Sequence, residues 1–450
     1  MGRARGSNWW ASRRGALAVE GSGWLLAFTF PGQGSQRPAM GAAWVDHPSW
    51  ELVEHASEVL DRDVAELLLE ADAERLTRTT NAQLATFVAS LVVLDATERL
   101  GLQPAAAAGH SLGEYTALVA TGALSYEDGL RLVAERGEAM QDAADHAPGT
   151  MMAVLGLPDD AVEAACVRAE GEVWVANYNA PGQVVIAGTE ESLARAAQIA
   201  RSLGAKRVLR FAVGGAFHTP LMAPARDRLR KALQAVAFRE AEPVVVANVD
   251  ARPHPDPLEW PGLLSAQLCA PVRWRQTLEA LHASGARTFV ELGPGGVLTG
   301  LLRRALPAED VTGHSVATPD DLEALVEALG AAAERERRAH AVGERYVMTE
   351  RLVVAPATGP FRLHEALAAA APKLRSGRHR HRAGAHGGEA DDAGPALRLA
   401  VGDLVGWAGD VEIRSPFAGS LEGVLVLAGE RVVTGQPVAW LRVDDDQDAS

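Results

Sequence analysis

The chain has 450 residues, enough for two or three domains, and its composition is that of a globular protein. It carries 58 acidic and 43 basic residues, a formal net charge of −15. This excess argues against nucleic acid or an anionic membrane as the general partner, and an acidic substrate would need a local cation. The two cysteines, Cys166 and Cys269, are too few for a disulfide framework and are not at a metal-ligand spacing. We therefore expect a reducing, cytoplasmic compartment and no metal.

Residues 1–24 are expected to be a disordered extension ahead of the first core strand. Their arginines and the apolar stretch Ala16 to Val19 are reminiscent of an export signal, but Glu20 and several glycines interrupt the apolar run. A start codon placed too early is a further alternative. No apolar run approaches the roughly 20 residues that a membrane helix needs, so we expect no membrane partner.

Through the first two thirds of the chain, short apolar segments alternate with longer helical patterns, which is typical of an α/β domain with a parallel sheet. We place this domain at residues 25–340. Its expected core strands are Leu25 to Phe30, Pro104 to Ala108, Val244 to Val249 and Thr288 to Leu292. Its expected helices include Ala82 to Leu100 and a closing helix from Pro319 to roughly Glu334.

Between about residues 150 and 211 the pattern changes to a β-α-β-α order. The expected strands are Met151 to Leu155 and Gln183 to Ala187, and the expected helices are Asp159 to Glu170 and Glu190 to Leu203. This order predicts a small ferredoxin-like subdomain inserted into the larger domain.

The segment Gly109-His110-Ser111-Leu112-Gly113 has the Gly-x-Ser-x-Gly pattern of a nucleophile elbow and lies between a predicted strand and a predicted helix. Small residues allow the sharp turn that exposes the serine hydroxyl. The helix N-terminus stabilises developing negative charge, and the amide of Leu112 is a candidate oxyanion donor. The pentapeptide alone is a modest signal, because chance and various hydrolases also produce it.

Two further segments supply what a serine nucleophile requires. The loop Phe30-Pro31-Gly32-Gln33-Gly34-Ser35-Gln36 follows the first strand, at the sheet edge where ligands bind, and the amide of Gln33 is a candidate second oxyanion contact. A serine hydroxyl needs a base at neutral pH, and His218, in an apolar segment, is the candidate.

Together these segments resemble the malonyl-CoA:acyl carrier protein transacylase family and the related acyltransferase domains of polyketide synthases. The resemblance runs from about Leu25 to Gly330 and includes Asn177 to Gly188, Asn248-Val249-Asp250 and Glu291-Leu292-Gly293-Pro294-Gly295. It implies a hydrolase-like parallel-sheet core with the inserted ferredoxin-like subdomain.

The resemblance also implies roles for individual residues. Ser111 is the expected nucleophile and His218 its general base, with Gln33 and the Leu112 amide forming the oxyanion hole. Gln267 matches the position whose backbone carbonyl orients the histidine in place of an acid. A triad aspartate is therefore not required.

Substrate selection is expected from two more residues. Arg136 matches the arginine that holds the malonyl carboxylate, and a planar guanidinium binds a carboxylate through two parallel hydrogen bonds. Phe217, in the pattern Ala216-Phe217-His218, matches the malonyl-selecting form of the family and leaves little room for an added methyl group.

The implied activity is S-malonyltransferase. The malonyl group passes from malonyl-CoA to Ser111 and then to the phosphopantetheine thiol of holo-acyl carrier protein, for fatty-acid synthesis. A serine hydrolase or thioesterase with the same elbow, and a polyketide-type acyltransferase, remain alternatives. No cofactor is expected beyond the coenzyme A thioester that serves as substrate.

The last hundred residues contain an internal repeat, which predicts an all-β domain at 346–443. Val353 to Gly359 parallels Ile413 to Gly419, and Gly402-Asp403-Leu404-Val405 parallels Gly429-Glu430-Arg431-Val432. This repeat resembles the flattened barrel of biotinyl/lipoyl carrier domains.

Biotinyl/lipoyl domains attach their cofactor to a lysine, but this chain has no lysine after Lys373, so we expect neither biotin nor lipoate. We interpret the domain as a degenerate docking or structural module, with a carrier subunit as the alternative. A flexible insertion is expected at about 365–395, where Arg378-His379-Arg380-His381-Arg382 leaves metal binding as a further alternative, and an acidic tail at 444–450.

Overall fold

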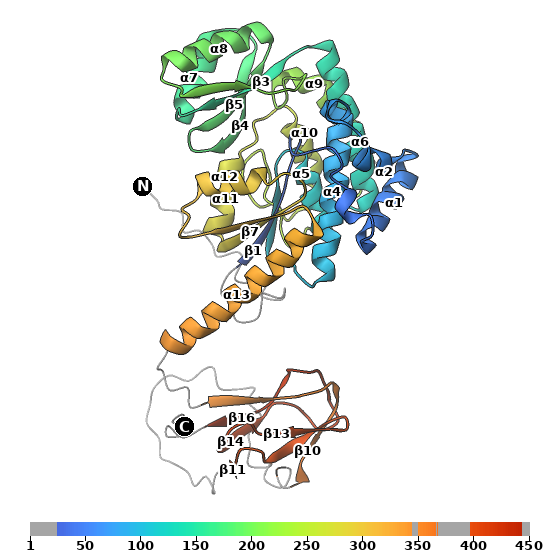
Figure 1. Cartoon of the computed structure of the whole chain (residues 1–450), viewed down its shortest axis with the longest axis vertical. Helices are drawn as coiled ribbons and strands as arrows, with labels where there is room; N and C mark the ends of the chain where they lie inside the picture. The colour runs from blue at the N-terminus through green and yellow to red at the C-terminus, as the bar shows by residue number, and fades with distance from the viewer. Residues whose placement is uncertain (1–24, 344–349, 366, 368–396, 443–450) are drawn as a thin grey trace. The chain divides into compact units, whose positions relative to one another are not determined.

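The computed structural model describes residues 25–343, 350–365, 367 and 397–442. It divides into two compact units, Met1–Arg337 and Arg338–Ser450 (Figure 1). The expected extension at 1–24, the acidic tail at 444–450 and nearly all of the expected insertion lie outside the described residues. Among the described helices, none has the length and apolar character to cross a membrane.

The first unit is built on a parallel sheet with the strand order β2-β1-β7-β8, which confirms the predicted α/β class. Its strands are β1 (Leu25–Phe30), β2 (Ala106–Gly109), β7 (Ala286–Leu292) and β8 (Thr312–Val316). Successive side chains of a strand point to opposite faces. Accordingly, Phe28 joins the larger apolar core, whereas Ala27 joins a second core on the other face.

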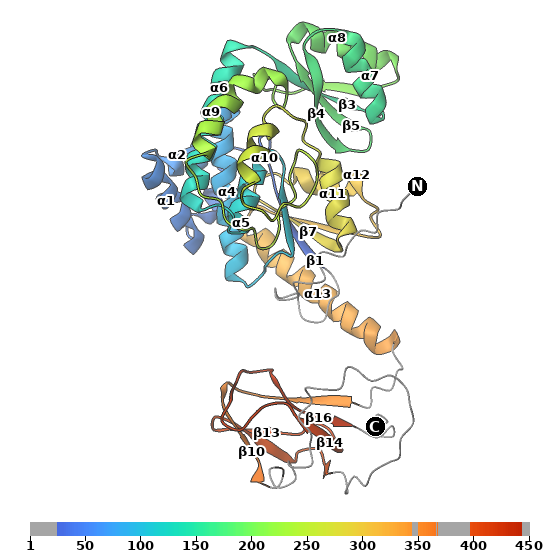
Figure 2. The same ribbon diagram turned by 180° about the vertical axis from the view of Figure 1, so that it is seen from behind.

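Helices cover both faces of this sheet (Figures 1 and 2). The larger core lies under α4 (Thr79–Arg99), α5 (Gly113–Ala120) and α6 (Tyr126–His146), and the second core lies under α11 (Trp274–Ala283) and α12 (Val297–Ala305). The remaining helices include α1 (Glu51–Leu60), α2 (Val64–Leu69), α3 (Ala73–Thr77), α9 (Ala223–Leu233), α10 (Trp260–Gln267) and α13 (Pro319–Gly343).

The strand predicted at Val244 to Val249 is wrong as a continuous element. Only Val245 pairs with the sheet, through an isolated parallel bridge to Ala107 of β2. The chain then turns, and the amide of Ala247 donates to the carbonyl of Arg252 at 2.8 Å. After the single bridge to Ala107, the segment therefore bonds its backbone groups to this turn and to other segments instead of continuing a ladder with β2.

The inserted subdomain has the ferredoxin-like β-α-β-β-α-β order. Its antiparallel sheet has the strand order β4-β5-β3-β6. Its elements are β3 (Thr150–Leu155), α7 (Asp159–Ala169), β4 (Val173–Ala180), β5 (Gln183–Gly188), α8 (Glu190–Ser202) and β6 (Arg207–Arg210). Strands β4 and β6 were not among the predicted elements. The latter is a short, largely exposed edge strand with little apolar signal.

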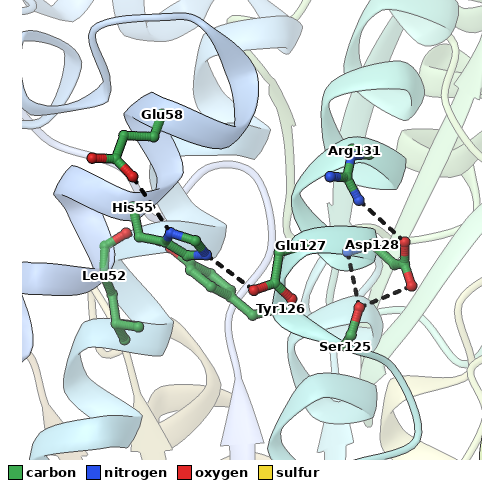
Figure 3. Close-up of polar contacts among 8 residues, drawn as sticks. All are labelled: Leu52, His55, Glu58, Ser125, Tyr126, Glu127, Asp128 and Arg131. Carbon is green, nitrogen blue, oxygen red and sulfur yellow. Dashed lines mark hydrogen bonds and ion pairs between the residues drawn. The ribbon is translucent and has the colours of Figure 1, made fainter.

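Helix α6 is fixed at its start by contacts with α1 (Figure 3). The hydroxyl oxygen of Ser125 accepts an amide N–H of the first turn at 3.1 Å, which caps the helix. The Tyr126 O–H donates to a main-chain carbonyl of α1 at 2.7 Å, and His55 of α1 lies 3.0 Å from the carboxylate of Glu127. These contacts set the axis of a helix that later brings an arginine to the elbow.

The turn between β2 and α5 leaves no space for side chains at its two glycines. A Cβ on Gly109 would lie on the carbonyl of Gly113, and a Cβ on Gly113 would lie on the carbonyl of Phe30. Between them, Ser111 has a φ of 54°, a left-handed conformation that is costly for a residue other than glycine. The turn is therefore the tight elbow that the sequence predicts.

The second unit contains two four-stranded antiparallel sheets, ordered β13-β12-β10-β15 and β11-β14-β16-β9. The strands are β9 (Glu350–Val354), β10 (Gly359–Leu363), β11 (Arg398–Leu399), β12 (Leu404–Ala408), β13 (Val411–Arg414), β14 (Gly419–Val424), β15 (Arg431–Val432) and β16 (Pro437–Arg442). Both sheets contribute to one apolar core that includes Phe361 and Leu441. Each copy of the sequence repeat supplies one strand to each sheet, β9 and β10 from the first and β13 and β14 from the second.

Replacing Gly113 with alanine tests the packing of the elbow. Because the added Cβ collides with main chain that has no free rotamer, we expect Gly113→Ala to lower the free energy of unfolding by about 2 kcal/mol or more. Gly300→Ala in α12 is the matched control, since nothing lies within 4 Å of its Cβ. Helix propensity predicts that Gly300→Ala is neutral or stabilising, by up to about 1 kcal/mol. Urea denaturation of the full chain measures both, and equal effects at the two positions would contradict this view of the elbow.

Candidate active site

Ser111 lies where β2 ends and α5 is about to begin, beside the loop that follows β1. The amide of His110 donates to the carbonyl of Phe30 at 2.9 Å, and Gly32 packs against the carbonyl of His110 so closely that a Cβ would overlap it. The loop predicted to contribute to the site and the elbow are therefore in direct contact. Both are at the carboxyl edge of the parallel sheet, where α/β proteins bind their ligands.

Ser111, His218 and Gln267 form a continuous chain of hydrogen-bonding groups. The hydroxyl oxygen of Ser111 lies 2.8 Å from Nε2 of His218. Nδ1 of the same ring lies 2.8 Å from the backbone carbonyl of Gln267. A carbonyl can only accept, so it requires the proton on Nδ1 and leaves the lone pair of Nε2 facing the serine. This geometry suits a serine nucleophile with a histidine base, with a carbonyl in the position of a triad acid.

The environment of His218 favours its neutral form. Burial, and after it the positive charge of Arg136, lower the pKa of His218 to about 3. The ring is only 4 % exposed, so water does not offset these effects. At neutral pH the imidazole is therefore unprotonated, the state that a general base needs.

Arg136, on α6, is a buried cation whose hydrogen-bond partners are neutral. One terminal nitrogen donates to Oε1 of Gln83 at 2.7 Å. The other donates to the hydroxyl oxygen of Ser111 at 3.0 Å and to Oε1 of Gln267 at 2.9 Å. Burial lowers the pKa of Arg136, yet a guanidinium stays protonated in proteins. A buried positive charge whose hydrogen-bond partners are neutral favours the binding of an anion, here beside the hydroxyl of Ser111.

Two side chains hold the main chain of Ser111. Oδ1 of Asn248 accepts the serine N–H at 2.7 Å, and Nε2 of Gln267 donates to the serine carbonyl at 2.9 Å. The amide of Gly113 bonds to a carbonyl of the turn at 3.0 Å. Within the described residues the intervening amide of Leu112 has no acceptor, which leaves it available to an oxyanion.

The remaining predicted residues, Gln33 and Phe217, have less defined places. Gln33 is half-buried on the loop after β1, and none of the hydrogen bonds among the described residues involves its side chain. Phe217 is 5 % exposed and directly precedes His218 in the larger core. The structure therefore brings Ser111, His218, Arg136 and Gln267 into direct contact.

Sequence reasoning assigned no role to Gln83 or Glu114, and gave Asn248 only as part of a matching segment. Gln83 is a polar residue within the otherwise apolar helix α4, and its exposed fraction is 0 %. Glu114 is a charged residue in the first turn of α5, directly after the elbow, and its exposed fraction is 1 %. The sequence signal that could have identified both residues is a polar side chain at a helix position where the pattern predicts burial.

Comparisons with known proteins match the first unit. A family model described as an acyl transferase domain matches residues 27–341. The malonyl CoA-acyl carrier protein transacylase of Bacillus subtilis strain 168 is 39 % identical over 309 residues, which cover 68 % of this chain and 97 % of that protein. The protein of the same name from Escherichia coli K12 is also 39 % identical, over 67 % of this chain and 99 % of its own length.

Solved structures agree with these sequence matches. The acyl-carrier-protein S-malonyltransferase of Burkholderia pseudomallei 1710b is 40 % identical, covers 67 % of this chain and 99 % of its own, and superposes with a TM-score of 0.65. A malonyl-transacylase solved in complex with a type II polyketide synthase acyl-carrier protein is 36 % identical, with the same TM-score of 0.65 and the same shares of 67 % and 99 %. The chain therefore belongs to the acyl transferase family, and the malonyl CoA-acyl carrier protein transacylases are its relatives.

Proposed function

We propose that this chain transfers the malonyl group from malonyl-CoA to the phosphopantetheine thiol of acyl carrier protein, and so supplies malonyl units for fatty-acid synthesis. The observation that carries this function is a convergence on one atom. The hydroxyl oxygen of Ser111 lies 2.8 Å from Nε2 of His218 and 3.0 Å from a terminal nitrogen of Arg136. A nucleophile, its base and a carboxylate-binding cation therefore meet at one point. The names of the relatives support the same activity.

In the first half-reaction, Ser111 becomes acylated. Nε2 of His218 takes the hydroxyl proton while the serine oxygen attacks the thioester carbonyl. The resulting oxyanion accepts the amide N–H of Leu112, with the side-chain amide of Gln33 as the proposed second donor. When the tetrahedral intermediate collapses, the carbon–sulfur bond breaks, and His218 returns its proton to the leaving thiolate of coenzyme A.

Arg136 gives this step its preference for a carboxylate-bearing acyl group. A malonyl carboxylate takes up the guanidinium nitrogen that otherwise donates to Ser111. The carboxylate also offsets the charge that lowers the pKa of His218. Binding of the correct substrate thereby releases the nucleophile and strengthens its base together. Phe217, packed beside the base, restricts the space available for a branched acyl group.

In the second half-reaction, the phosphopantetheine thiol of acyl carrier protein replaces coenzyme A. His218 takes the thiol proton, the sulfur attacks the ester of Ser111, and the same oxyanion donors stabilise the second tetrahedral intermediate. Collapse breaks the carbon–oxygen bond and returns the proton to Ser111. The cycle needs neither a metal nor a bound cofactor, and we place it in the cytoplasm.

We propose that the second unit is a biotinyl/lipoyl-like module that carries no cofactor and serves in docking. Two observations support this assignment. The two antiparallel sheets share one apolar core, and each sheet receives one strand from each copy of the repeat. The hairpin between β12 and β13 turns through only two residues, Gly409 and Asp410, since Ala408 pairs with Val411. Neither residue offers an amine for biotin or lipoate.

Incubation with malonyl-CoA tests the proposed activity. We expect the intact mass of the protein to increase by one malonyl group, located on the peptide that contains Ser111, and holo-acyl carrier protein to remove it. Ser111→Ala should gain no such mass, because it lacks the attacking oxygen. Mass spectrometry of both proteins measures this. A malonyl adduct on Ser111→Ala, or none on the wild-type chain, would rule out the proposed intermediate.

Replacing Arg136 with alanine tests the selection of malonyl groups. Loss of a paired, hydrogen-bonded carboxylate contact costs about 3 kcal/mol, so we expect kcat/KM for malonyl-CoA to fall about 100-fold. The value for acetyl-CoA, which has no carboxylate, should fall much less or rise. Arg131→Ala on the same helix is the control, because the Arg131 side chain is 59 % exposed and pairs only with Asp128 among the salt bridges of the described residues. Equal losses for both substrates in Arg136→Ala would contradict the assigned role.

A further inference from the structure

Glu114 is a buried carboxylate for which the transfer mechanism has no step. It lies three residues after Ser111, in the first turn of α5, and is 1 % exposed. Its Oε1 accepts the backbone N–H of Asn248 at 2.6 Å, and its Oε2 accepts Nε2 of Gln267 at 2.5 Å. One side chain thus joins the elbow helix to two segments that come more than a hundred residues later.

Both partners of Glu114 in turn hold the reacting groups. Asn248 receives the N–H of Ser111 on Oδ1 and donates from Nδ2 to the carbonyl of Gly109, each at 2.7 Å. Gln267 donates from Nε2 to the carbonyl of Ser111 at 2.9 Å and receives Arg136 on Oε1 at 2.9 Å. Its backbone carbonyl receives the imidazole of the base at 2.8 Å. Glu114 is therefore one contact away from the nucleophile, the cation and the base.

We propose that Glu114 is a positioning residue, which fixes the amide of Gln267 and the main chain at Asn248 and so holds Ser111, Arg136 and His218 in their reacting geometry. This inference rests on the proposed function and assigns Glu114 no contact with the substrate.

The polarity of the contacts explains why a carboxylate is required. The amide of Gln267 must direct Nε2 toward Ser111 and Oε1 toward Arg136. A carboxylate only accepts hydrogen bonds, so it permits this one orientation. A glutamine at 114 that keeps its oxygen toward Asn248 turns its NH₂ group toward Nε2 of Gln267, placing two donors together. Rotating the Gln267 amide only moves the mismatch to Ser111 and Arg136, because both contacts then reverse in polarity.

The charge of Glu114 makes this role dependent on pH. Burial raises the pKa of Glu114 to about 7. The charge of Asp250 also contributes to this rise, and the hydrogen bonds from Asn248 and Gln267 and the charge of Arg136 oppose it. Protonation would turn an acceptor into a donor facing N–H groups. The neutral imidazole of His218, whose pKa is about 3, adds no charge there near neutral pH. Ser111 acylation should therefore increase as pH rises through about 7.

Stability should change in the opposite direction over this range. The pKa of Glu114 is raised from 4.5 to about 7, so the folded chain binds more protons than the unfolded chain between these values. The contribution of Glu114 to stability then falls as pH rises through this window. Reactivity and stability are therefore expected to change in opposite directions over this range, so the rise in reactivity cannot be attributed to a more stable fold.

The test compares Glu114→Gln with Glu291→Gln in the full chain. Glu291 is an equally buried carboxylate, 1 % exposed, whose Oε2 accepts the amide and hydroxyl of Thr299. Single-turnover acylation of Ser111 is followed by mass spectrometry between about pH 6 and pH 9, with malonyl-CoA and with a fluorophosphonate that lacks a carboxylate. We expect Glu114→Gln to react about 100-fold more slowly with both reagents and to lose the pH dependence near 7, since small misplacements cost this much. Glu291→Gln should stay within about threefold of the wild-type chain and keep that dependence.

Wild-type rates or an unchanged pH profile in folded Glu114→Gln would overturn the inference. If that variant does not fold, the pH profile of Ser111 acylation in the wild-type chain, measured at several temperatures, tests the inference instead. The pKa of a carboxyl group changes little with temperature, whereas the pKa of an imidazole falls clearly as temperature rises. A pH-independent wild-type rate, or a pKa with the temperature dependence of an imidazole, would also overturn it. Failure of the wild-type chain to accept malonyl would instead contradict the proposed function, and the fluorophosphonate rates would still test Glu114.

Discussion

The main chain of Ser111 is the constraint on which the rest of the site depends. A φ of 54° is unfavourable for serine, so the conformation persists only because its surroundings enforce it. Glycines on both sides let the strand and helix close around the turn, and Asn248 and Gln267 bond the serine N–H and carbonyl. The same geometry places the hydroxyl against His218 and leaves the next amide without an acceptor among the described residues, as the proposed oxyanion contact requires. The strained backbone of Ser111 is therefore the same feature that places its hydroxyl for the proposed reaction.

Beside this turn, the guanidinium of Arg136 is buried without an acidic hydrogen-bond partner among the described residues. Arg136 donates to neutral oxygens of Gln83, Gln267 and Ser111. Such a cation is costly to bury, and that cost makes an incoming carboxylate favourable. Burial and, after it, this charge lower the pKa of His218 and keep its ring neutral. An acidic chain with a formal net charge of −15 can thus accept an acidic acyl group at one local point.

Sequence reasoning identified the residues that have a recognisable pattern and missed those defined only by tertiary contacts. The elbow spacing and the resemblance gave Ser111, and the structure places His218 and Arg136 against it. The roles of Gln83 and Glu114 depend on contacts with segments 53 or more positions away, which no local pattern encodes. The strand expected at Val244 to Val249 failed for a related reason, because apolar residues there serve a turn that presents Asn248 to the elbow. The edge strand β6 was missed since its exposed side chains carry little hydrophobic alternation.

The partition of the malonyl group on Ser111 between thiol and water tests the central claim most directly. Purified malonyl-enzyme is mixed with holo-acyl carrier protein, and the malonyl thioester and free malonate are measured as they form. We expect nearly all of the malonyl group to move to the carrier thiol, and the ester on Ser111 to be lost far more slowly when no carrier is present. Release of mostly free malonate in the presence of the carrier would contradict the account, because the site would then be that of a hydrolase.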